Sequence, residues 1–463
     1  MAHFSCRWRN VFICMCTPCI LLVLIFIYVL VVVTMTMNSM PHAVENANSL
    51  DKAHFIAPGG YKNKTFALTP KTFWRFREKA FWNRAQNKMD RFFNPLLRPR
   101  ITRRRLQNDK VFDSLQRWSI ASGTKAFKKW FQTLTEPMQT FVANMDRRDY
   151  PVIIEPEACG AGSEVEKEPP LILLAIKSTE LNFANRQAIR HTWGKVGWVG
   201  WQKRNSSREE ADGGYIRRVF LLGIESTQEQ SGRKTSPMLQ MESQFYKDIL
   251  QWDFQDTFFN LTLKDVLFWR WFAKRCSTTL FILKGDDDVV VNTPNMVAFL
   301  RDKLRDPLQR KKLDSFMVGE VIDDAKPNRL HKSKYYVPKS FYMGLYPLYA
   351  GGGGVVYSGT LAQRLFNISK TLHLFPIDDV FVGMCMLRLN IRPIHHDAFL
   401  TFDFPKKELH QACNYHSILL VHKRSPKELY KIWTEIQTQT QCWHVPLREV
   451  VKKKKPVPTA IPD

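Results

Sequence analysis

The sequence predicts an α/β domain with a largely parallel sheet, from about residue 169 to 447. Apolar segments alternate there with amphipathic ones, beginning with LILLAI at 171–176 and RQAIRHTWG at 186–194. Such alternation is typical of strands and helices in βαβ units, whose strands lie parallel. Because ligands bind at the carboxyl ends of the strands in these sheets, polar residues that directly follow an apolar strand are the first candidates for a functional site.

The N-terminal region predicts a membrane anchor. Residues 11–37 carry no charge, and this run is long enough to cross a bilayer of roughly 30 Å. A cleaved signal peptide would have a shorter apolar stretch of about 7–15 residues and a small-residue cleavage site. We therefore expect a retained signal anchor. Arg7 and Arg9 before it predict that residues 1–10 form a cytosolic tip and that the body is lumenal, as in a single-pass type II membrane protein.

Residues 38–168 are expected to form a basic stem. Residues 61–150 alone hold 21 Lys and Arg against 7 Asp and Glu. Aromatic residues between 73 and 93 are expected to dock on the domain, and residues 448–463 form a charged tail. A net charge of +25 would ordinarily favour nucleic-acid binding, but a lumenal location argues against a nucleic-acid partner. A solvated basic face remains the simpler interpretation.

Secretory-pathway features agree with this orientation. Five cysteines lie beyond the anchor, so disulfides are expected in an oxidising compartment and the odd number leaves one thiol free or intermolecular. The sequence does not determine their pairing. Four Asn-x-Ser/Thr sequons predict a glycoprotein, at Asn63, Asn205, Asn260 and Asn367.

The most informative motif is FILKGDDDVVVN at 281–292, where an apolar strand ends in three adjacent carboxylates. Oxygen ligands of this kind suit Mg²⁺ or Mn²⁺ bound to a diphosphate. Alternate residues of an extended segment point the same way, so Asp286 and Asp288 can face one site together. A solvated acidic turn is the alternative, although such a turn does not require the apolar strands on both sides.

A glycine run, YPLYAGGGGVVYSG at 346–359, is the second motif. Its glycines give a backbone that is able to take positive φ and to approach a ligand closely, while Tyr346 and Tyr349 are suited to packing on a sugar ring. The alternative is a flexible loop with core tyrosines. The glycines are Gly351, Gly352, Gly353 and Gly354.

A second acidic pair, Asp378 and Asp379, lies between apolar segments in LFPIDDVFVGMC. A partly desolvated carboxylate has a raised pKa and can act as a general base; a helix N-cap is the alternative. Arg186 and Arg190, four residues apart on one helix face, could contact a diphosphate, or they could form a solvated face.

In this order the motifs resemble the Golgi β-1,3-glycosyltransferases of glycosyltransferase family 31, over roughly residues 169–445. AGGGG and PIDDV resemble the N-acetylglucosaminyltransferase branch, particularly its polylactosamine-extending type. The resemblance implies a GT-A fold, UDP-GlcNAc as donor, a divalent metal that is usually Mn²⁺, and inverting transfer to O3 of a terminal galactose. It also implies a Golgi membrane location, a glycoprotein or glycolipid acceptor, and homo- or hetero-oligomers with other glycosyltransferases.

The resemblance also implies residue roles. Lys177 and Arg186 would contact the nucleotide, Asp286 the ribose side, Asp288 the metal, and Asp379 would be the catalytic base with Asp378 beside it. Arg190 and Asp287 would complete the donor site. His396, with His395 adjacent, falls at a family histidine that would complete the metal shell.

Three departures from the family pattern stand out. Asp146-Arg147-Arg148 replaces an Arg-Cys-Arg, so Cys159 could be the odd thiol, and Asn185 precedes Arg186 where the family has a second arginine. The arginine-rich stem and the lysine-rich tail have no recognised counterpart. A UDP-galactose donor on the same fold, and a catalytically silent glycan-binding protein, remain the alternatives to N-acetylglucosamine transfer.

Overall fold

The computed structural model describes Ile25, Tyr28 and residues 80–93, 125–157, 159–162, 168–200, 213–225 and 235–450. The chain divides into two compact units, residues 1–53 with 69–73 and residues 54–68 with 74–463; the second holds every described residue except Ile25 and Tyr28. Nearly all of the expected anchor, the sequons at Asn63 and Asn205, and residues 451–463 lie outside the described residues. Within the described residues, no helix has the length and apolar character to cross a bilayer.

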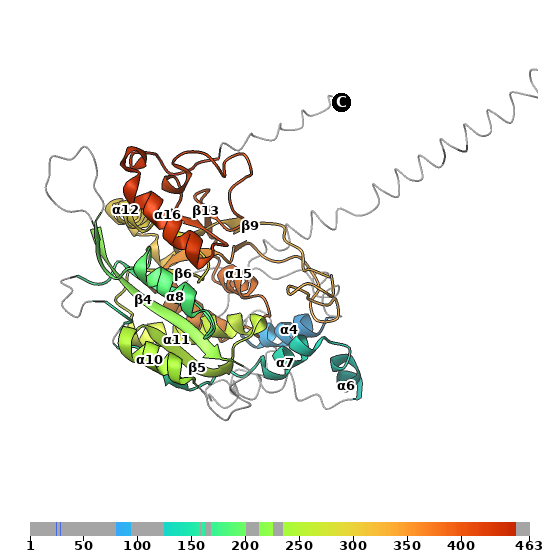
Figure 1. Ribbon diagram of the computed structural model, residues 1–463. Coiled ribbons are helices and arrows are strands. Elements are labelled where there is room, and N and C mark those ends of the chain that lie inside the picture. The colour runs from blue at the N-terminus through green and yellow to red at the C-terminus, as the bar shows by residue number, and fades with distance from the viewer. Residues whose placement is uncertain are drawn as a thin grey trace, which may run out of the picture. The chain divides into compact units, whose positions relative to one another are not determined.

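A nine-stranded mixed sheet forms the centre of the second unit, in the order β1-β5-β4-β2-β6-β11-β8-β12 with β3 paired to β4. Figure 1 labels β4, β5 and β6 of this sheet. Strands β5, β4, β2 and β6 run parallel, so the expectation of a largely parallel sheet is confirmed for these four strands. Strands β1 and β3 pair antiparallel with β5 and β4. Strand β11 runs antiparallel to both β6 and β8, so the sheet is mixed beyond β6. The strands are β1 Val152–Ile154, β2 Ile172–Lys177, β3 Gly197–Gly200, β4 Gly213–Ile224, β5 Ile249–Gln255, β6 Phe281–Asp286, β8 Met317–Gly319, β11 Gly354–Ser358 and β12 Ile394–His395.

Helices cover both faces of this sheet. Strand β2 shows why: Leu173 and Ala175 join one hydrophobic cluster, whereas Ile172, Leu174 and Ile176 join the other, as the alternation of side chains along a strand requires. The first cluster takes in α4 Phe81–Phe93, α7 Glu136–Asn144, α11 Leu261–Arg275, α14 Gly359–Ser369 and α15 Asp378–Arg388. The second takes in α8 Phe183–His191, α10 Pro237–Tyr246, α12 Thr293–Arg305 and α16 Pro426–Thr438.

Smaller elements complete the fold. A two-stranded sheet pairs β9 with β10, and a three-stranded sheet has the strand order β13-β14-β7. Two short helices complete the set: α6 packs aromatic side chains against the first cluster, and α13 lies against α12. Their bounds are β7 Val290–Val291, β9 Val321–Ile322, β10 Tyr349–Ala350, β13 Phe399–Leu400, β14 Leu420–Val421, α6 Lys125–Phe131 and α13 Pro307–Arg310.

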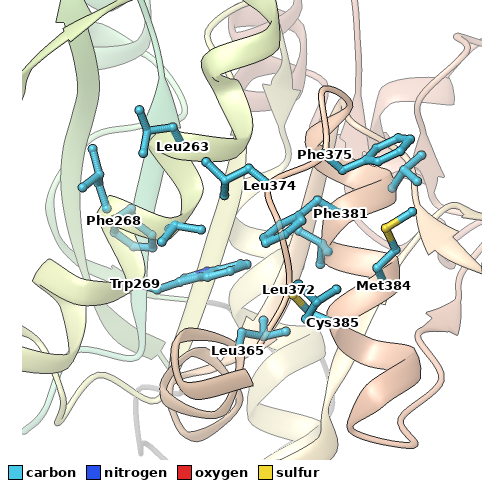
Figure 2. Packing of buried hydrophobic residues seen from close by; sticks show 14 of the residues in the cluster. Leu263, Phe268, Trp269, Leu365, Leu372, Leu374, Phe375, Phe381, Met384 and Cys385 are labelled. Carbon is cyan, nitrogen blue, oxygen red and sulfur yellow. The ribbon is translucent and has the colours of Figure 1, made fainter. Parts of the chain in front are cut away.

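The first cluster packs helix α11 against helix α15 and the loop that precedes it (Figure 2). Trp269 of α11, Leu374 of that loop and Phe381 of α15 lie next to one another in this cluster. Trp269 and Phe381 are fully buried. The start of α15 is therefore held in a dense apolar environment, which matters for the two carboxylates located there.

Part of the expected stem belongs to this same unit. Phe81 and Trp82 of α4 are buried, and Trp82 packs edge-on against Phe375 at 5.4 Å between ring centroids. This confirms docking for these two aromatic residues. Strand β1, also before residue 169, pairs with β5. The folded unit thus begins well before the expected domain boundary.

Two disulfides lie within the described residues, Cys159–Cys276 and Cys413–Cys442. The expectation that Cys159 is the odd thiol is therefore wrong. Among the cysteines of the described ranges, the free one is Cys385, buried in α15. Burial raises the pKa of its thiol to about 12, so it remains a protonated, apolar core residue.

Candidate functional site

A cavity of about 560 Å³ opens at the carboxyl ends of β2 and β6, the edge where ligands bind in such sheets. Three of the motifs found in the sequence meet there. Its lining includes Lys177, Asp286, Asp287, Asp288, Tyr346, Tyr349, Gly352, Gly353, Asp378, Asp379 and His422.

Strand register brings the first charges together. Lys177 ends β2 directly beside Asp286, which ends the parallel strand β6, and the two side chains are 3.0 Å apart. The Lys177 ammonium also lies 2.7 Å from Asp378. Burial opposes a charge on Lys177, but Asp286 and Asp378 raise its pKa well above the ordinary value. Lys177 therefore links the acidic strand end to the acidic helix start.

Asp286, Asp288 and His422 form a cluster suited to a divalent cation. One ligand atom from each lies within 4.8 Å of the others, and His422 Nε2 is 3.1 Å from Asp288 Oδ1. Burial opposes ionisation of Asp288, but the hydrogen bond and charge of His422 lower its pKa. His422 Nδ1 is 3.2 Å from the Thr401 carbonyl oxygen; donation to that oxygen would leave Nε2 free for a metal. Two carboxylates and one imidazole are ligands suited to a divalent metal cation.

The structure does not bring His396 to this cluster, and its role as a metal ligand stays a prediction. Its ring packs against Phe299 at 5.1 Å, its Nδ1 accepts from the Ala398 amide, and it is outside the cluster found among the described residues. His422 takes this place because β14, which precedes it, pairs antiparallel with β7, which follows Asp288. The buried run ILLV before His422 is a strand signal that the sequence-based prediction missed.

Asp287 is held differently from its neighbours. It is buried and accepts hydrogen bonds from Ser178 at 2.6 Å and Asn182 at 3.0 Å. Burial raises its pKa to about 6 despite these two hydrogen bonds. Its carboxylate orders the turn after β2, while its backbone carbonyl accepts from Asn185. The expected donor contact of Asp287 stays a prediction.

Asp378 and Asp379 occupy the first turn of α15 but have opposite ionisation behaviour. Burial opposes charge on Asp378, yet Lys177 and Lys284 lower its pKa to about 2. Burial and the adjacent Asp378 charge raise the pKa of Asp379 well above its ordinary value. Side by side, the pair consists of a permanently ionised carboxylate and a carboxyl group that binds a proton readily.

A buried ion pair lies close to the Asp378 carboxylate. Lys284 of β6 bonds Asp265 of α11 at 2.5 Å, and both side chains are almost inaccessible. The sequence-based prediction did not identify Asp265. Its signal is a charged pair, Lys264 and Asp265, between apolar residues of α11; both are fully buried.

The glycine run serves a different purpose from the expected one. All four glycines are described, and none has φ in the left-handed region. They are required for space: a Cβ on Gly352 would stand 2.5 Å from Asp379 Oδ2, and one on Gly353 would stand 2.9 Å from His422 Cβ. The run therefore lets the backbone pass close to both functional clusters.

Tyr346 and Tyr349 line the cavity as expected. The Tyr346 hydroxyl and Thr401 Oγ1 are buried and have no hydrogen-bond partner among the described residues. Phe258 and Tyr335, which the sequence-based prediction did not single out, add a ring pair at 5.0 Å. The cavity thus combines aromatic faces with unpaired hydroxyl groups.

Arg186 and Arg190 lie on one helix face as expected, and neither is among the residues that line the cavity. Arg186 nevertheless donates to Ser178 Oγ at 3.1 Å and to the Thr179 carbonyl, which both line it. Arg186 bonds Glu242 through two nitrogen atoms, and Arg190 bonds Glu242 and Asp248. Both guanidinium groups are buried. Their carboxylate partners are Glu242 in α10 and Asp248 directly before β5, so both arginines form structural ion pairs.

The sequons at Asn260 and Asn367 fall within the described residues. Asn367 is exposed on α14, whereas the Asn260 amide donates to the Gln255 carbonyl at 2.8 Å. Glycosylation at either position stays a prediction.

Comparisons with known proteins agree with this geometry. The Galactosyltransferase family model matches residues 184–397, which include the acidic strand end, the glycine run and the Asp378–Asp379 pair but not Lys177 or His422. Human N-acetyllactosaminide β-1,3-N-acetylglucosaminyltransferase 2 is 39% identical over 79% of this chain and 87% of its own length. The human enzyme numbered 4 in that series is 43% identical over 62% and 68%. Rat UDP-GlcNAc:βGal β-1,3-N-acetylglucosaminyltransferase 7 is 39% identical over 68% and 74%.

Proposed function

We propose, from the premise that the chain belongs to the β-1,3-glycosyltransferase family, that it transfers N-acetylglucosamine from UDP-GlcNAc to O3 of a terminal galactose on lactosamine-type glycans. The observation that carries the proposal is the position of Asp379. Its carboxyl group, with a raised pKa, shares one cavity with the Asp286, Asp288 and His422 cluster. A proton acceptor and a cation site in one cavity are what displacement of a nucleoside diphosphate requires.

The charges divide the chemistry between neighbouring residues. Lys177 and Lys284 keep Asp378 ionised, and its negative charge makes Asp379 the better proton acceptor. Asp379 removes the proton from the acceptor hydroxyl as its oxygen bonds to the anomeric carbon of the donor sugar. The bond from that carbon to the diphosphate oxygen breaks in the same step. One displacement inverts the anomeric configuration and needs no enzyme nucleophile.

Asp286, Asp288 and His422 would hold Mn²⁺, which when bound offsets the negative charge of the departing UDP. The aromatic rings of Tyr349 and Tyr335 are suited to the apolar faces of the sugar rings. The unpaired Tyr346 hydroxyl and Thr401 Oγ1 are suited to binding sugar hydroxyl groups.

The same proposal includes the GT-A fold and the cellular setting. We place the enzyme in the Golgi membrane as a type II protein with the catalytic unit in the lumen, because residues 11–37 are uncharged and basic residues precede them. Protein glycosylation with poly-N-acetyllactosamine chains is part of the same proposal. Oligomers with the same or other glycosyltransferases are part of this expectation.

The direct test measures UDP release by the detergent-solubilised full chain. The assay supplies a lactosamine acceptor with UDP-GlcNAc or UDP-galactose, each with Mn²⁺ and with EDTA. We expect metal-dependent turnover with UDP-GlcNAc and a β-1,3 linkage in the product. Turnover with UDP-galactose alone would refute the donor assignment, and silence with both donors would favour the glycan-binding alternative.

The glycine run offers a second test. Gly352→Ala places a methyl group 2.5 Å from Asp379 Oδ2, so either the carboxylate or the loop must move. We expect kcat to fall roughly 10- to 100-fold, since small misplacements of a catalytic group have effects of this size. Gly200→Ala is the control, because its new Cβ would meet nothing closer than 3.8 Å. Equal kcat values for the two variants would contradict the close approach of Gly352 to the base.

A further inference from the structure

The loop between α14 and α15, residues 370–377, leads directly into Asp378 and Asp379. Leu372, Leu374 and Phe375 are buried within it, and Figure 2 shows them between α11 and α15. A buried loop needs hydrogen-bond partners for its backbone. The source of those partners determines what fixes the start of α15.

The N-terminal part of the unit supplies most of the side-chain partners, from three residues. Gln86 Oε1 accepts from the His373 amide at 2.9 Å, and Gln86 Nε2 donates to the Thr371 carbonyl at 3.0 Å. Trp82 Nε1 donates to the Leu374 carbonyl at 3.0 Å. Arg148 donates to the carbonyls of Ser369 and Leu372. One further contact comes from α11, where Thr262 Oγ1 donates to the Phe375 carbonyl at 2.5 Å.

Helix α4, which carries Trp82 and Gln86, also contacts the C-terminal end of α15. Arg388, in the last turn of α15, lies 3.1 Å from Asp90 of α4, and both side chains are buried. Gln86 donates to Asp90 at 2.7 Å, which joins this ion pair to the loop contacts. Helix α4 therefore contacts both the loop that precedes α15 and the helix's last turn.

We propose that α4 and Arg148 position the catalytic base, with Trp82, Gln86 and Arg148 as positioning residues that act through the loop. The donor side of the cavity is built on β2, β6 and the residue after β14. The hydrogen bonds that these three side chains make to described residues instead reach the loop, Ser369 and Asp90. Loss of a loop contact should then affect the proton-transfer step more than donor binding. This inference rests on the proposed function, because it assigns α4 a role in placing Asp379.

Two residues of α4 provide a matched pair of variants. Gln86 and Asn83 are both almost fully buried, and each exchanges hydrogen bonds with a distant backbone segment. Asn83 donates to the Met343 carbonyl and accepts from the Met343 amide, both at 3.0 Å. Gln86→Met and Asn83→Leu keep side-chain volume close to the original and remove the polar contacts. Only the first change affects the loop before α15.

The experiment measures kcat, the donor KM, the pH profile of kcat and the melting temperature for the full chain and both variants. For Gln86→Met we expect a roughly 10- to 100-fold lower kcat, a donor KM within about twofold of the original, and a shifted acidic limb of the profile. For Asn83→Leu we expect a similar loss of melting temperature but the original pH profile and a kcat within about threefold.

Equal kcat losses in the two variants, or an unchanged pH profile in Gln86→Met, would overturn the positioning role. If Gln86→Met does not fold, Trp82→Phe tests the same point, since it keeps the ring against Phe375 and removes the donation to Leu374. Its expected kcat loss is roughly 3- to 10-fold, and an unchanged kcat would overturn the inference. An inactive original chain would refute the proposed function instead, so the two failures are distinguishable.

Discussion

Asp379→Asn is expected to lower kcat by roughly 10²- to 10⁴-fold, the usual contribution of a general base. Asparagine has nearly the same shape but cannot accept the proton of the acceptor hydroxyl. Lys177, Asp286 and His422 remain in place, so the donor KM should change little. UDP release measured at saturating donor and acceptor gives kcat, and tryptophan fluorescence on heating shows whether the variant is folded.

The pH profile provides an independent readout of the same residue. A base acts only after it has lost its proton, so kcat should rise with pH as Asp379 ionises. Burial and the Asp378 charge raise its pKa, so the acidic limb should lie above the ordinary aspartate value of about 3.9. Asp378, with a pKa of about 2, is ionised throughout this range and cannot produce the limb. A folded Asp379→Asn variant with the original kcat would remove Asp379 from the role of base.

The sequence predicted the parts of the fold that depend on local pattern. Apolar runs that end in charge identified β2 and β6, and the parallel register of the two strands in the structure places Lys177 beside Asp286. Adjacent carboxylates likewise identified Asp378 and Asp379. These features can be recognised in the sequence because a buried strand and the charged residue at its end are contiguous in the chain.

Other features depend on contacts between distant segments. Arg186 and Arg190 were interpreted as anion ligands, yet their partners Glu242 and Asp248 lie more than fifty residues away. The glycine run was interpreted as a backbone able to take positive φ, whereas its purpose is set by Asp379 and His422 on other elements. Neither the antiparallel direction of β11 nor the docking geometry of α4 is encoded in a local period.

His422→Ala is expected to weaken metal binding by at least roughly 10- to 100-fold, since loss of even an outer-shell partner of a metal ligand has effects of this size. The structure places His422 Nε2 3.1 Å from Asp288 Oδ1 and 3.6 Å from Asp286 Oδ2. Removing the imidazole leaves two carboxylates that still attract a divalent cation but enclose it less completely. The Mn²⁺ concentration that gives half-maximal UDP release should rise accordingly.

His396→Ala is the matched control, and it separates the histidine that the sequence favours from the one that the structure favours. His396 packs on Phe299 and Phe399, so its loss should lower the melting temperature and leave Mn²⁺ affinity unchanged. Binding measured directly by electron paramagnetic resonance of free Mn²⁺, without substrates, makes the comparison independent of turnover. Weaker binding in His396→Ala with normal binding in His422→Ala would reverse the assignment. Weaker binding in His422→Ala alone would locate the cation where β6 and β14 end, between the carboxylates of Asp286 and Asp288 and the His422 imidazole.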